Sequence, residues 1–317
     1  MDIVRWGILG YARIAEMSTI PAILEAENAV FYGMASRDQA KRVACQEKFH
    51  CEKTYETYDE LLDDPLVDAV YVPLPNSLHK EWAIKAMEKG KHVLCEKPMT
   101  LNEEDAIEMV ESSKKNGVIL MEAFMYLYTH RTKKVQEILE SGVIGDIKHV
   151  TSSFRFFLNR PNTIKMNSAL GGGSLYDVGC YPLNFVQMVI GEEPSEVHVA
   201  AEMENGVDIS ASVLLKYESG KIATIHSGFN AFGRNYSEII GTKGRLEIPD
   251  TFLDNEGSIF LVTDEGALEI SIPGCHRYTL EIEDFSKSVL LGEKPLFSVD
   301  ESHRNSRIMD RILEKLK

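Results

Sequence analysis

The chain has 317 residues, of which 44% are hydrophobic and 26% charged, so it is long enough for two globular domains. Its formal net charge of −15 disfavours nucleic acid and anionic membranes as partners, because both bind basic surfaces. No apolar run approaches the roughly 18 residues of a membrane span, and the first residues indicate a strand rather than a signal peptide. The five cysteines are scattered, and no Cys/His cluster has zinc spacing. We therefore expect a cytoplasmic protein without a bound metal.

Residues 1–124 alternate between short β-rich runs and helical patterns. Pro21 is expected to bend or restart the first helix, because proline lacks a backbone N–H. Strands and helices that alternate at this spacing predict an α/β domain with a doubly wound parallel sheet. The predicted strands are 3–10, 29–36, 67–75, 91–96 and 118–124, and the predicted helices are 14–26, 37–49, 58–64, 78–90 and 102–117.

Residues 125–317 have a different order of predicted elements. One helix is followed by longer β-rich runs and a helical tail. Gly220, Gly244 and Gly266 mark hairpin turns between successive runs. We expect a second, α+β domain with an antiparallel sheet, whose C-terminal helix packs back on the first domain. The predicted helix is 132–142, the β-rich runs are 146–157, 195–203, 207–229, 237–248 and 258–272, and the helical tail covers 279–293 and 300–317.

The first predicted strand runs into the sequence GILGYARIAE, residues 7–16. Gly10 permits a tight turn, Ala12 lets the backbone approach a pyrophosphate, and Ala15 lets the next helix pack closely. The pattern departs from G-x-G-x-x-G, and a tight turn without a ligand is the alternative. Its place in the first βαβ unit favours a dinucleotide site. We assign to this site Gly10, Tyr11, Ala12, Arg13 and Ile14.

The second predicted strand ends where an NAD enzyme usually places an acid for the ribose 2′-hydroxyl. Ser36 and Arg37 stand there instead, and Lys41 follows one turn later. A hydroxyl and two cations suit the 2′-phosphate of NADP, so we predict NADP as the cofactor. Asp38 keeps NAD as the alternative.

Two further strands end in polar loops at the same predicted edge of the sheet, where doubly wound folds bind ligands. We expect the loop after the third strand to line the cofactor through Leu74, Pro75, Asn76 and His79, with packing or capping as the alternative for His79. The next strand ends in Glu96, Lys97 and Pro98. We interpret Lys97 as the catalytic cation, Glu96 as a residue that lines the cofactor or orients Lys97, and Pro98 as a stiffener of the loop.

The stretch GGGSLYDVGCYPLN, residues 171–184, places three glycines before a helical pattern. Asp177 and Tyr181 are four residues apart and therefore share one face of that helix. A carboxylate beside a phenol can handle protons. The alternative is that Asp177 caps the helix and Tyr181 packs in the core.

In this order, these stretches resemble the glucose–fructose oxidoreductase / inositol dehydrogenase / rhizopine catabolism (Gfo/Idh/MocA) family over nearly the whole chain. The most specific marks are Glu96–Lys97–Pro98 and GGGSLYDVGCY. Tyr181 stands where the family's Asp-x-x-x-His motif has histidine, which is similar to the branch with dimeric dihydrodiol dehydrogenase and NADP-dependent D-xylose dehydrogenase. The resemblance implies a Rossmann domain, a second domain with an open, mostly antiparallel sheet, and a homodimer through that sheet.

The resemblance also implies hydride transfer between a nicotinamide and a sugar, polyol or dihydrodiol-type alcohol or carbonyl. Tyr181 would be the acid/base, and the Lys97 ammonium would lower its pKa from the ordinary value near ~10. Asp177 would hold a substrate hydroxyl or orient Lys97 and Tyr181. The two alternatives are a non-catalytic NADP-sensing regulator and an NAD-assisted glycoside hydrolase. The expected substrate pocket consists of Phe154, Arg155, Asn159, Arg160, Asp177 and Tyr181.

Overall fold

The computed structural model describes residues 3–160 and 163–316. The described chain forms two compact units. The first contains the residues up to Met125 together with His276–Arg304, and the second contains Tyr126–Cys275 together with the residues from Asn305 onward. The tail segment 276–304 therefore groups with the N-terminal residues, whereas the domain boundary at 124/125 stays a prediction.

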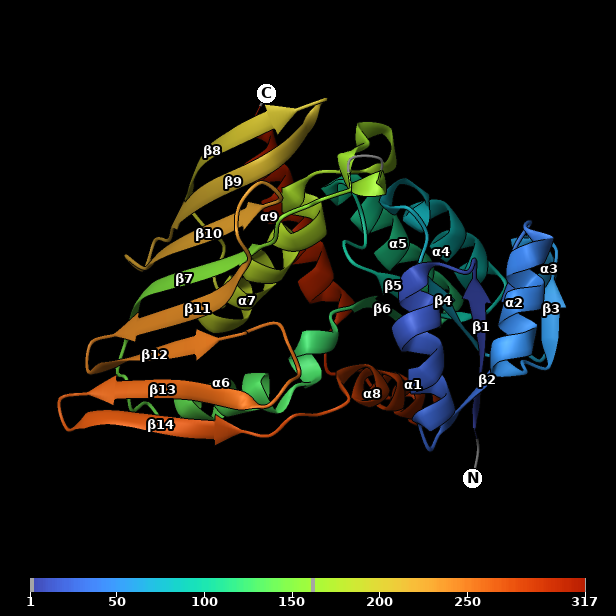
Figure 1. Cartoon of the computed structure of the whole chain (residues 1–317), viewed down its shortest axis with the longest axis horizontal. Helices are drawn as coiled ribbons and strands as arrows, with labels where there is room; N and C mark the ends of the chain where they lie inside the picture. Colours follow the sequence, from blue (N-terminus) through green and yellow to red (C-terminus); the bar gives the residue numbers. More distant parts are fainter. Residues whose placement is uncertain (1–2, 161–162, 317) are drawn as a thin grey trace. The chain divides into compact units, whose positions relative to one another are not determined.

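The first unit is built on a six-stranded sheet in the order β3-β2-β1-β4-β5-β6 (Figure 1). Every neighbouring pair is parallel, which confirms the predicted doubly wound sheet. This strand order places the topological switch point between β1 and β4. The short strand β3 was not predicted, because three residues carry too little periodicity. The strands are β1 Val4–Leu9, β2 Ala29–Ala35, β3 Lys53–Tyr55, β4 Ala69–Val72, β5 His92–Glu96 and β6 Leu120–Ala123.

Helices pack against this sheet, and the first of them begins irregularly. A π-helical turn, Ala15–Thr19, precedes α1, and the Ile20 N–H bonds back to the Ala15 carbonyl. Pro21 lies in the first turn of α1, which confirms the expected restart of the helix. The helices of this unit are α1 Ile20–Glu25, α2 Gln39–Phe49, α3 Tyr58–Leu62, α4 His79–Glu88, α5 Glu103–Asn116 and α8 Arg277–Leu291.

Helix α8 joins the first unit although it lies near the C-terminus of the chain. The indole of Trp6, on the central strand β1, is fully buried and donates its Nε1–H to Ser286 Oγ at 3.1 Å. The same indole packs against Phe285, with 5.1 Å between ring centroids. One large side chain therefore supplies both apolar contact and a satisfied polar atom.

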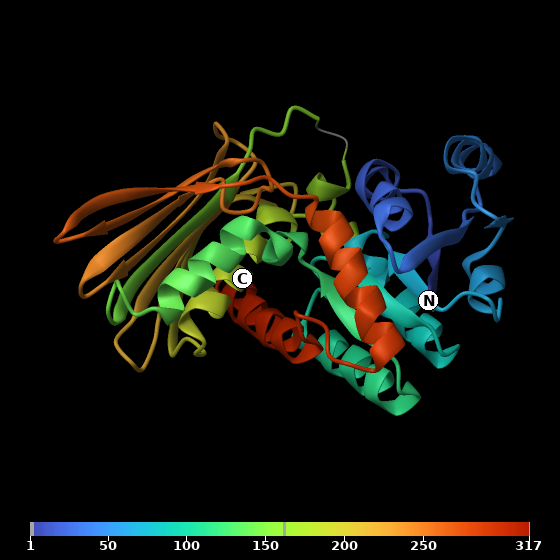
Figure 2. The same ribbon diagram turned by 90° about the horizontal axis from the view of Figure 1, so that it is seen from below.

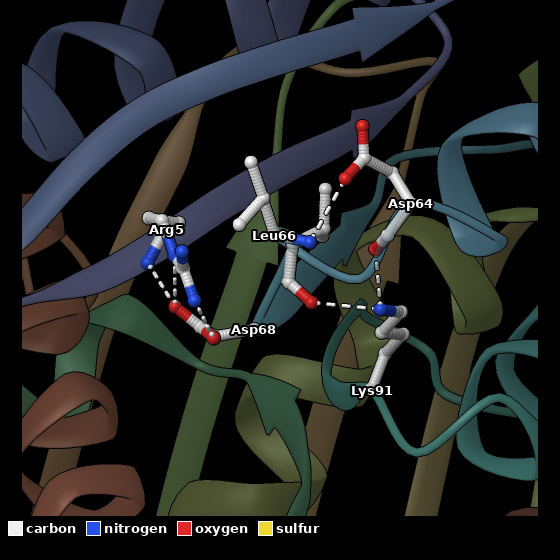
Figure 3. Close-up of polar contacts among 6 residues, drawn as sticks. Arg5, Asp64, Leu66, Asp68 and Lys91 are labelled. Carbon is white, nitrogen blue, oxygen red and sulfur yellow. Dashed lines mark hydrogen bonds and ion pairs between the residues drawn. The ribbon is translucent and has the colours of Figure 1, made fainter.

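The amino-terminal edge of the sheet is held by charged side chains that pair with one another and with backbone groups (Figure 3). The Arg5 guanidinium donates to both carboxylate oxygens of Asp68, at 2.9 and 2.8 Å. Lys91 is buried, and its Nζ donates to the carbonyls of Asp64 and Val67 at 2.7 and 2.8 Å. Burial lowers the pKa of Lys91, but these carbonyls satisfy its ammonium.

The second unit is built on an eight-stranded sheet in the order β14-β13-β12-β11-β7-β10-β9-β8. Among the described residues of this sheet, β7 and β10 pair in parallel and the other neighbouring strands pair antiparallel, which confirms the predicted, mostly antiparallel sheet. Gly220 and Gly266 adopt positive φ at the predicted hairpin turns. The strands are β7 Ile147–Arg155, β8 Glu196–Glu204, β9 Val207–Lys216, β10 Ile222–Gly228, β11 Arg234–Gly241, β12 Gly244–Pro249, β13 Gly257–Thr263 and β14 Gly266–Ile272.

Helices α6, His130–Glu140, and α7, Cys180–Ile190, cover one face of this sheet (Figure 2). The last helix, α9, Val299–Glu314, begins in the first unit and ends in the second. Within the residues described above, no helix is both long and apolar enough to cross a membrane. No group of three His, Cys, Asp or Glu side chains in the same residues could hold a metal ion.

Asp64 gives a testable consequence for stability. Burial raises the pKa of its carboxyl group, but hydrogen bonds from Lys53, the Leu66 N–H and Tyr55 outweigh burial and bring the pKa from 3.8 to about 2. A carboxyl with a depressed pKa in the folded state stabilises the fold above its unfolded pKa and loses this contribution as the pH falls. We expect Asp64→Asn to lower the unfolding free energy by about 1–2 kcal/mol at pH 7, after allowance for solvent screening.

Urea titrations of both proteins at pH 7, 4 and 2 measure this difference. The gap between wild type and variant should close between pH 4 and pH 2. A gap that stays constant with pH would show that the carboxylate charge contributes nothing. The exposed Asp264, in the β13–β14 turn, provides the matched control Asp264→Asn.

Candidate active site

The turn after β1 is tight and depends on Gly10. Gly10 has φ +94°, which disfavours any other residue, and its N–H donates to the Ala35 carbonyl at 2.8 Å. A Cβ at this position would lie 3.2 Å from Tyr58 Oη and 3.4 Å from Leu74 Cδ2. The chain therefore passes close to two other loops of the same edge. Tyr11, Ala12 and Ile14 are half-buried and Arg13 is exposed in this turn, so a ligand can reach them.

The residues at the end of β2 bear on the choice between NADP and NAD. Asp38 caps α2 by accepting the Ala40 N–H at 2.9 Å, so one of its carboxylate oxygens is already used. Ser36 accepts the N–H of Asp38 at 3.2 Å. Arg37 and Lys41 are exposed and make no ion pair within the described chain. Their positive charges are therefore available to a phosphate, which fits NADP better than NAD.

His79 ties two loops of this edge together. It is fully buried, and its Nδ1 and Nε2 lie 2.9 Å from the Pro98 carbonyl and 2.8 Å from the Leu74 carbonyl. Burial lowers the pKa of this imidazole. Because both ring nitrogens face protein carbonyls, we assign His79 a positioning role. Pro75 and Asn76 stand in the loop that it holds.

Lys97 follows the last residue of β5 and precedes a cis peptide bond to Pro98. Glu96 is buried and accepts a hydrogen bond from the Tyr71 hydroxyl, and burial raises the pKa of Tyr71. The N–H of Met99 donates to Glu122 Oε1 at 2.8 Å. Tyr71 and Glu122 were missed at the level of sequence. The only signal was an acid in the middle of the apolar run 118–124.

In the second unit, Asp177 and Tyr181 lie at the start of one helix, as predicted. Asp177 stands in a π-helical turn, Leu175–Gly179, and Tyr181 lies in the first turn of α7. The Lys165 ammonium forms an ion pair with Asp177 and lies 5.4 Å from the centre of the Phe156 ring. Lys165 was not predicted, because nothing in the local sequence shows that its loop returns to Asp177.

The Tyr181 ring packs among aromatic side chains of the second unit. Its centroid lies 5.4 Å from that of Phe154, 5.5 Å from that of Phe252 and 6.0 Å from that of Tyr126. The expected neighbour Phe154 is therefore beside Tyr181.

Arg155 follows Phe154 directly on β7, and its place in the expected substrate pocket stays a prediction. Successive strand residues face opposite sides, so Arg155 lies on the other face of β7 from Phe154. Its backbone pairs across the ladder with that of Arg234. Burial and the two guanidinium groups lower the pKa of His226. Asn159 and Arg160 are exposed and make no hydrogen bond within the described chain.

A buried network fixes the start of the helix that carries Asp177 and Tyr181. Asp208, on β9, accepts the Ser174 hydroxyl at 2.6 Å and the Leu175 N–H at 2.9 Å. Gly173 has φ +119°, and a Cβ there would lie 2.4 Å from Asp208 Oδ1. The glycine is required both by the backbone conformation and by the approach of this carboxylate. The helix is thus capped by a residue distant in sequence.

Comparison with known proteins matches both halves of the chain to one family. Residues 4–124 match the model of an oxidoreductase family with an NAD-binding Rossmann fold, named GFO_IDH_MocA, and residues 132–247 match the GFO/IDH/MocA C-terminal domain. The chain belongs to the Gfo/Idh/MocA oxidoreductase family. The resemblance carried by Glu96–Lys97–Pro98 and GGGSLYDVGCY is thereby confirmed.

Relatives within this family span the whole chain. D-xylose 1-dehydrogenase (NADP(+)) 2 of Haloferax volcanii is 35% identical over 98% of this chain and 96% of that protein. Trans-1,2-dihydrobenzene-1,2-diol dehydrogenase of Xenopus laevis is 31% identical over 98% of both. The crystal structure of KijD10, a 3-ketoreductase from Actinomadura kijaniata in complex with NADP and TDP-benzene, matches with a TM-score of 0.91 and 29% identity over 99% of this chain and 98% of that one. The branch suggested by Tyr181 is therefore confirmed as well.

Proposed function

We propose that the protein is an NADP-dependent oxidoreductase that moves hydride between the nicotinamide and the CH–OH carbon, or carbonyl carbon, of a sugar, polyol or dihydrodiol-type substrate. The observation that carries this proposal is the position of Lys97, at the carboxyl end of β5, on the same sheet edge as Gly10 and Arg37. Relatives named for D-xylose and for a dihydrobenzenediol support this substrate class.

We assign the cofactor to the carboxyl edge of the first unit. The Gly10 turn would hold the pyrophosphate, and Ser36, Arg37 and Lys41 would hold the 2′-phosphate. Leu74, Pro75, Asn76 and Glu96 would line the rest of the site. Bound NADP supplies or accepts the hydride.

The protein's own residues would control the proton. Lys97 would donate a hydrogen bond to the substrate oxygen and stabilise the charge that develops there. Tyr181 would take or give the proton at that oxygen, since a nearby ammonium favours its phenolate form. Asp177, oriented by Lys165, would accept a hydrogen bond from a neighbouring substrate hydroxyl.

We further propose a cytoplasmic homodimer formed through the face of the eight-stranded sheet that lies opposite α6 and α7. Leu214 and Ile222 are more than a third exposed and lie on strands β9 and β10. Alternation along each strand places both side chains on the face away from the buried neighbours Leu215 and Ala223. Exposed apolar side chains on one sheet face are typical of an interface between subunits.

Light scattering tests the dimer. Wild type should have twice the 35.6 kDa mass of the chain, and Leu214→Arg should shift the population to the monomer, because it places a charge in an apolar contact. Asp264→Arg, on an exposed hairpin, is the control. A monomeric wild type would refute the dimer.

Catalytic substitutions test the chemistry. We expect Lys97→Ala and Tyr181→Phe each to lower kcat by a factor of about 10²–10⁴, because each removes a group that acts on the reacting oxygen. The readout is nicotinamide absorbance with NADP⁺ or NADPH across sugars, polyols and dihydrodiols. Lys148→Ala, on an exposed strand position, and Tyr217→Phe, a buried tyrosine bonded to Gln187, are matched controls.

Three outcomes of the same assay contradict the proposal. Near-wild-type turnover of Lys97→Ala would exclude the mechanism. Release of sugar without net change in cofactor would identify a glycoside hydrolase. Cofactor binding without any turnover would identify a regulator.

Arg37→Ala tests the choice of cofactor. The variant should bind NADP⁺ at least about tenfold more weakly while its affinity for NAD⁺ changes little, because only NADP carries the 2′-phosphate. Isothermal titration with both cofactors measures the two dissociation constants. Unchanged preference for NADP⁺ would refute this role of Arg37, and Lys243→Ala, which removes an exposed cation of the second unit, is the control.

A further inference from the structure

An open cavity of about 490 Å³ lies at the amino-terminal ends of β1, β4 and β5, within the first unit. Gly10 and Lys97 follow the carboxyl ends of β1 and β5, so the cavity is at the opposite edge of the sheet from the proposed cofactor site. Its volume is typical of sites for small molecules. None of the functional assignments above uses it. The residues that determine its chemistry are Ile3, Arg5, Asp68, Lys91, His92 and Leu290.

Lys91 brings a positive charge into this cavity. It is only 6% exposed, and its Nζ donates to the carbonyls of Asp64 and Val67 at 2.7 and 2.8 Å (Figure 3). These carbonyls occupy two of the three N–H groups of the ammonium, and they carry no net charge. Within residues 3–160 and 163–316, the third N–H has no hydrogen-bond partner, and no carboxylate forms an ion pair with Nζ. Lys91 can therefore bind one further acceptor.

The acids near Lys91 are held by other groups. Asp68 accepts hydrogen bonds from the Arg5 backbone N–H and from the Nε and Nη2 of its guanidinium, at 2.9, 2.9 and 2.8 Å. The Asp64 carboxylate is bound by a lysine and a tyrosine side chain. Among the residues that line the cavity, the formal charges of Arg5 and Lys91 against that of Asp68 leave one excess positive charge. Burial lowers the pKa of Lys91 despite the nearby acids, as expected for a cation without a close counter-ion.

His92 follows Lys91 and lines the same cavity. Its Nδ1 accepts the N–H of Ile119 at 3.0 Å, so the neutral ring carries its proton on Nε2. Burial lowers the pKa of this imidazole, which favours the neutral form. Nε2 has no hydrogen-bond partner within the part of the chain that the structure describes. The ring thus offers a second N–H donor in the wall of the cavity.

The wall of the cavity also contains apolar side chains. Ile3 precedes β1 and Leu290 belongs to the last turn of α8, and the two side chains are 47% and 37% exposed. Apolar surface beside one excess positive charge suits an organic anion with a single charge, because contact with the apolar surface adds to the ion pair. A doubly charged anion such as phosphate would carry more negative charge than the cavity balances, close to Asp68.

We propose that this cavity binds a small organic monocarboxylate. The carboxylate of the ligand accepts a hydrogen bond from Lys91 Nζ, with the Nε2–H of His92 as a second donor. The apolar body of the ligand packs against Ile3 and Leu290. The site is distinct from the proposed cofactor edge, and the proposal does not depend on the function proposed above.

An NMR titration of protein labelled with ¹³C-histidine tests the site, with sodium benzoate and sodium butyrate as probes. The His92 signal, identified by its loss in His92→Gln, should shift with a dissociation constant on the order of 1 mM. Lys91→Met removes the charge and should weaken benzoate binding at least about tenfold. Benzyl alcohol has the ring of benzoate without its charge and should bind to wild type as weakly as benzoate binds to that variant.

Two neighbouring leucines of α8 provide a matched pair of variants. Leu290→Glu adds a carboxylate to the wall of the cavity and should weaken benzoate binding at least about fivefold, because like charges repel. Leu291→Glu adds the same charge at a residue that is 59% exposed and lies outside the cavity wall, and should leave the constant unchanged within about twofold. Since both leucines are exposed, this pair tests the site even where Lys91→Met does not fold.

Three results overturn the proposal. A His92 signal that does not shift at about 20 mM benzoate or butyrate would show that no carboxylate binds. Benzyl alcohol or inorganic phosphate that binds as tightly as benzoate would show, respectively, an unspecific apolar surface or a general anion site. Equal constants for Leu290→Glu and Leu291→Glu would place the carboxylate elsewhere. All readouts are binding constants, so they are independent of turnover and of the catalytic role proposed for Lys97.

Discussion

In a parallel sheet, the carboxyl ends of all strands lie at one edge. The loops that leave this edge have no neighbouring strand to which their backbone N–H and carbonyl groups can bond. Buried carbonyl and N–H groups must nevertheless find partners. In the first unit, Glu122 accepts the N–H of Met99, and His79 faces the Leu74 and Pro98 carbonyls, to one of which a neutral imidazole can donate. Buried polar side chains thus contact the loop that carries Lys97, and the same side chains bring titratable groups close to the proposed chemistry.

In the second unit, the backbone N–H groups at the start of a helix also need partners. The first N–H groups of a helix lack partners within the helix, and here Asp208 supplies one from a neighbouring strand. The approach is possible because Gly173 has no side chain. The glycines before Asp177 and Tyr181 therefore have a geometric purpose in the protein itself, apart from any substrate.

The residues proposed to bind the cofactor and those proposed to bind the substrate differ in their ion pairs. Arg37 and Lys41 are exposed cations that form no ion pair with a carboxylate among the described residues, which suits them to the proposed phosphate. Asp177 already has a cation, Lys165, from its own unit. The cations proposed for the cofactor are thus unpaired with acids, whereas the carboxylate proposed for the substrate has a cation beside it.

The sequence by itself determined the class of each sheet, the glycine turn, the Ser36–Arg37 pair and the motif around Lys97. These features follow from periodicity and from local backbone requirements, which are written in consecutive residues. Only the tertiary structure decided that both nitrogens of His79 face carbonyls, and that Glu122, Lys165 and Asp208 contact Met99, Asp177 and the start of the helix at Leu175. These contacts join residues far apart in the chain, so their energies depend on burial and on partners that no local pattern records.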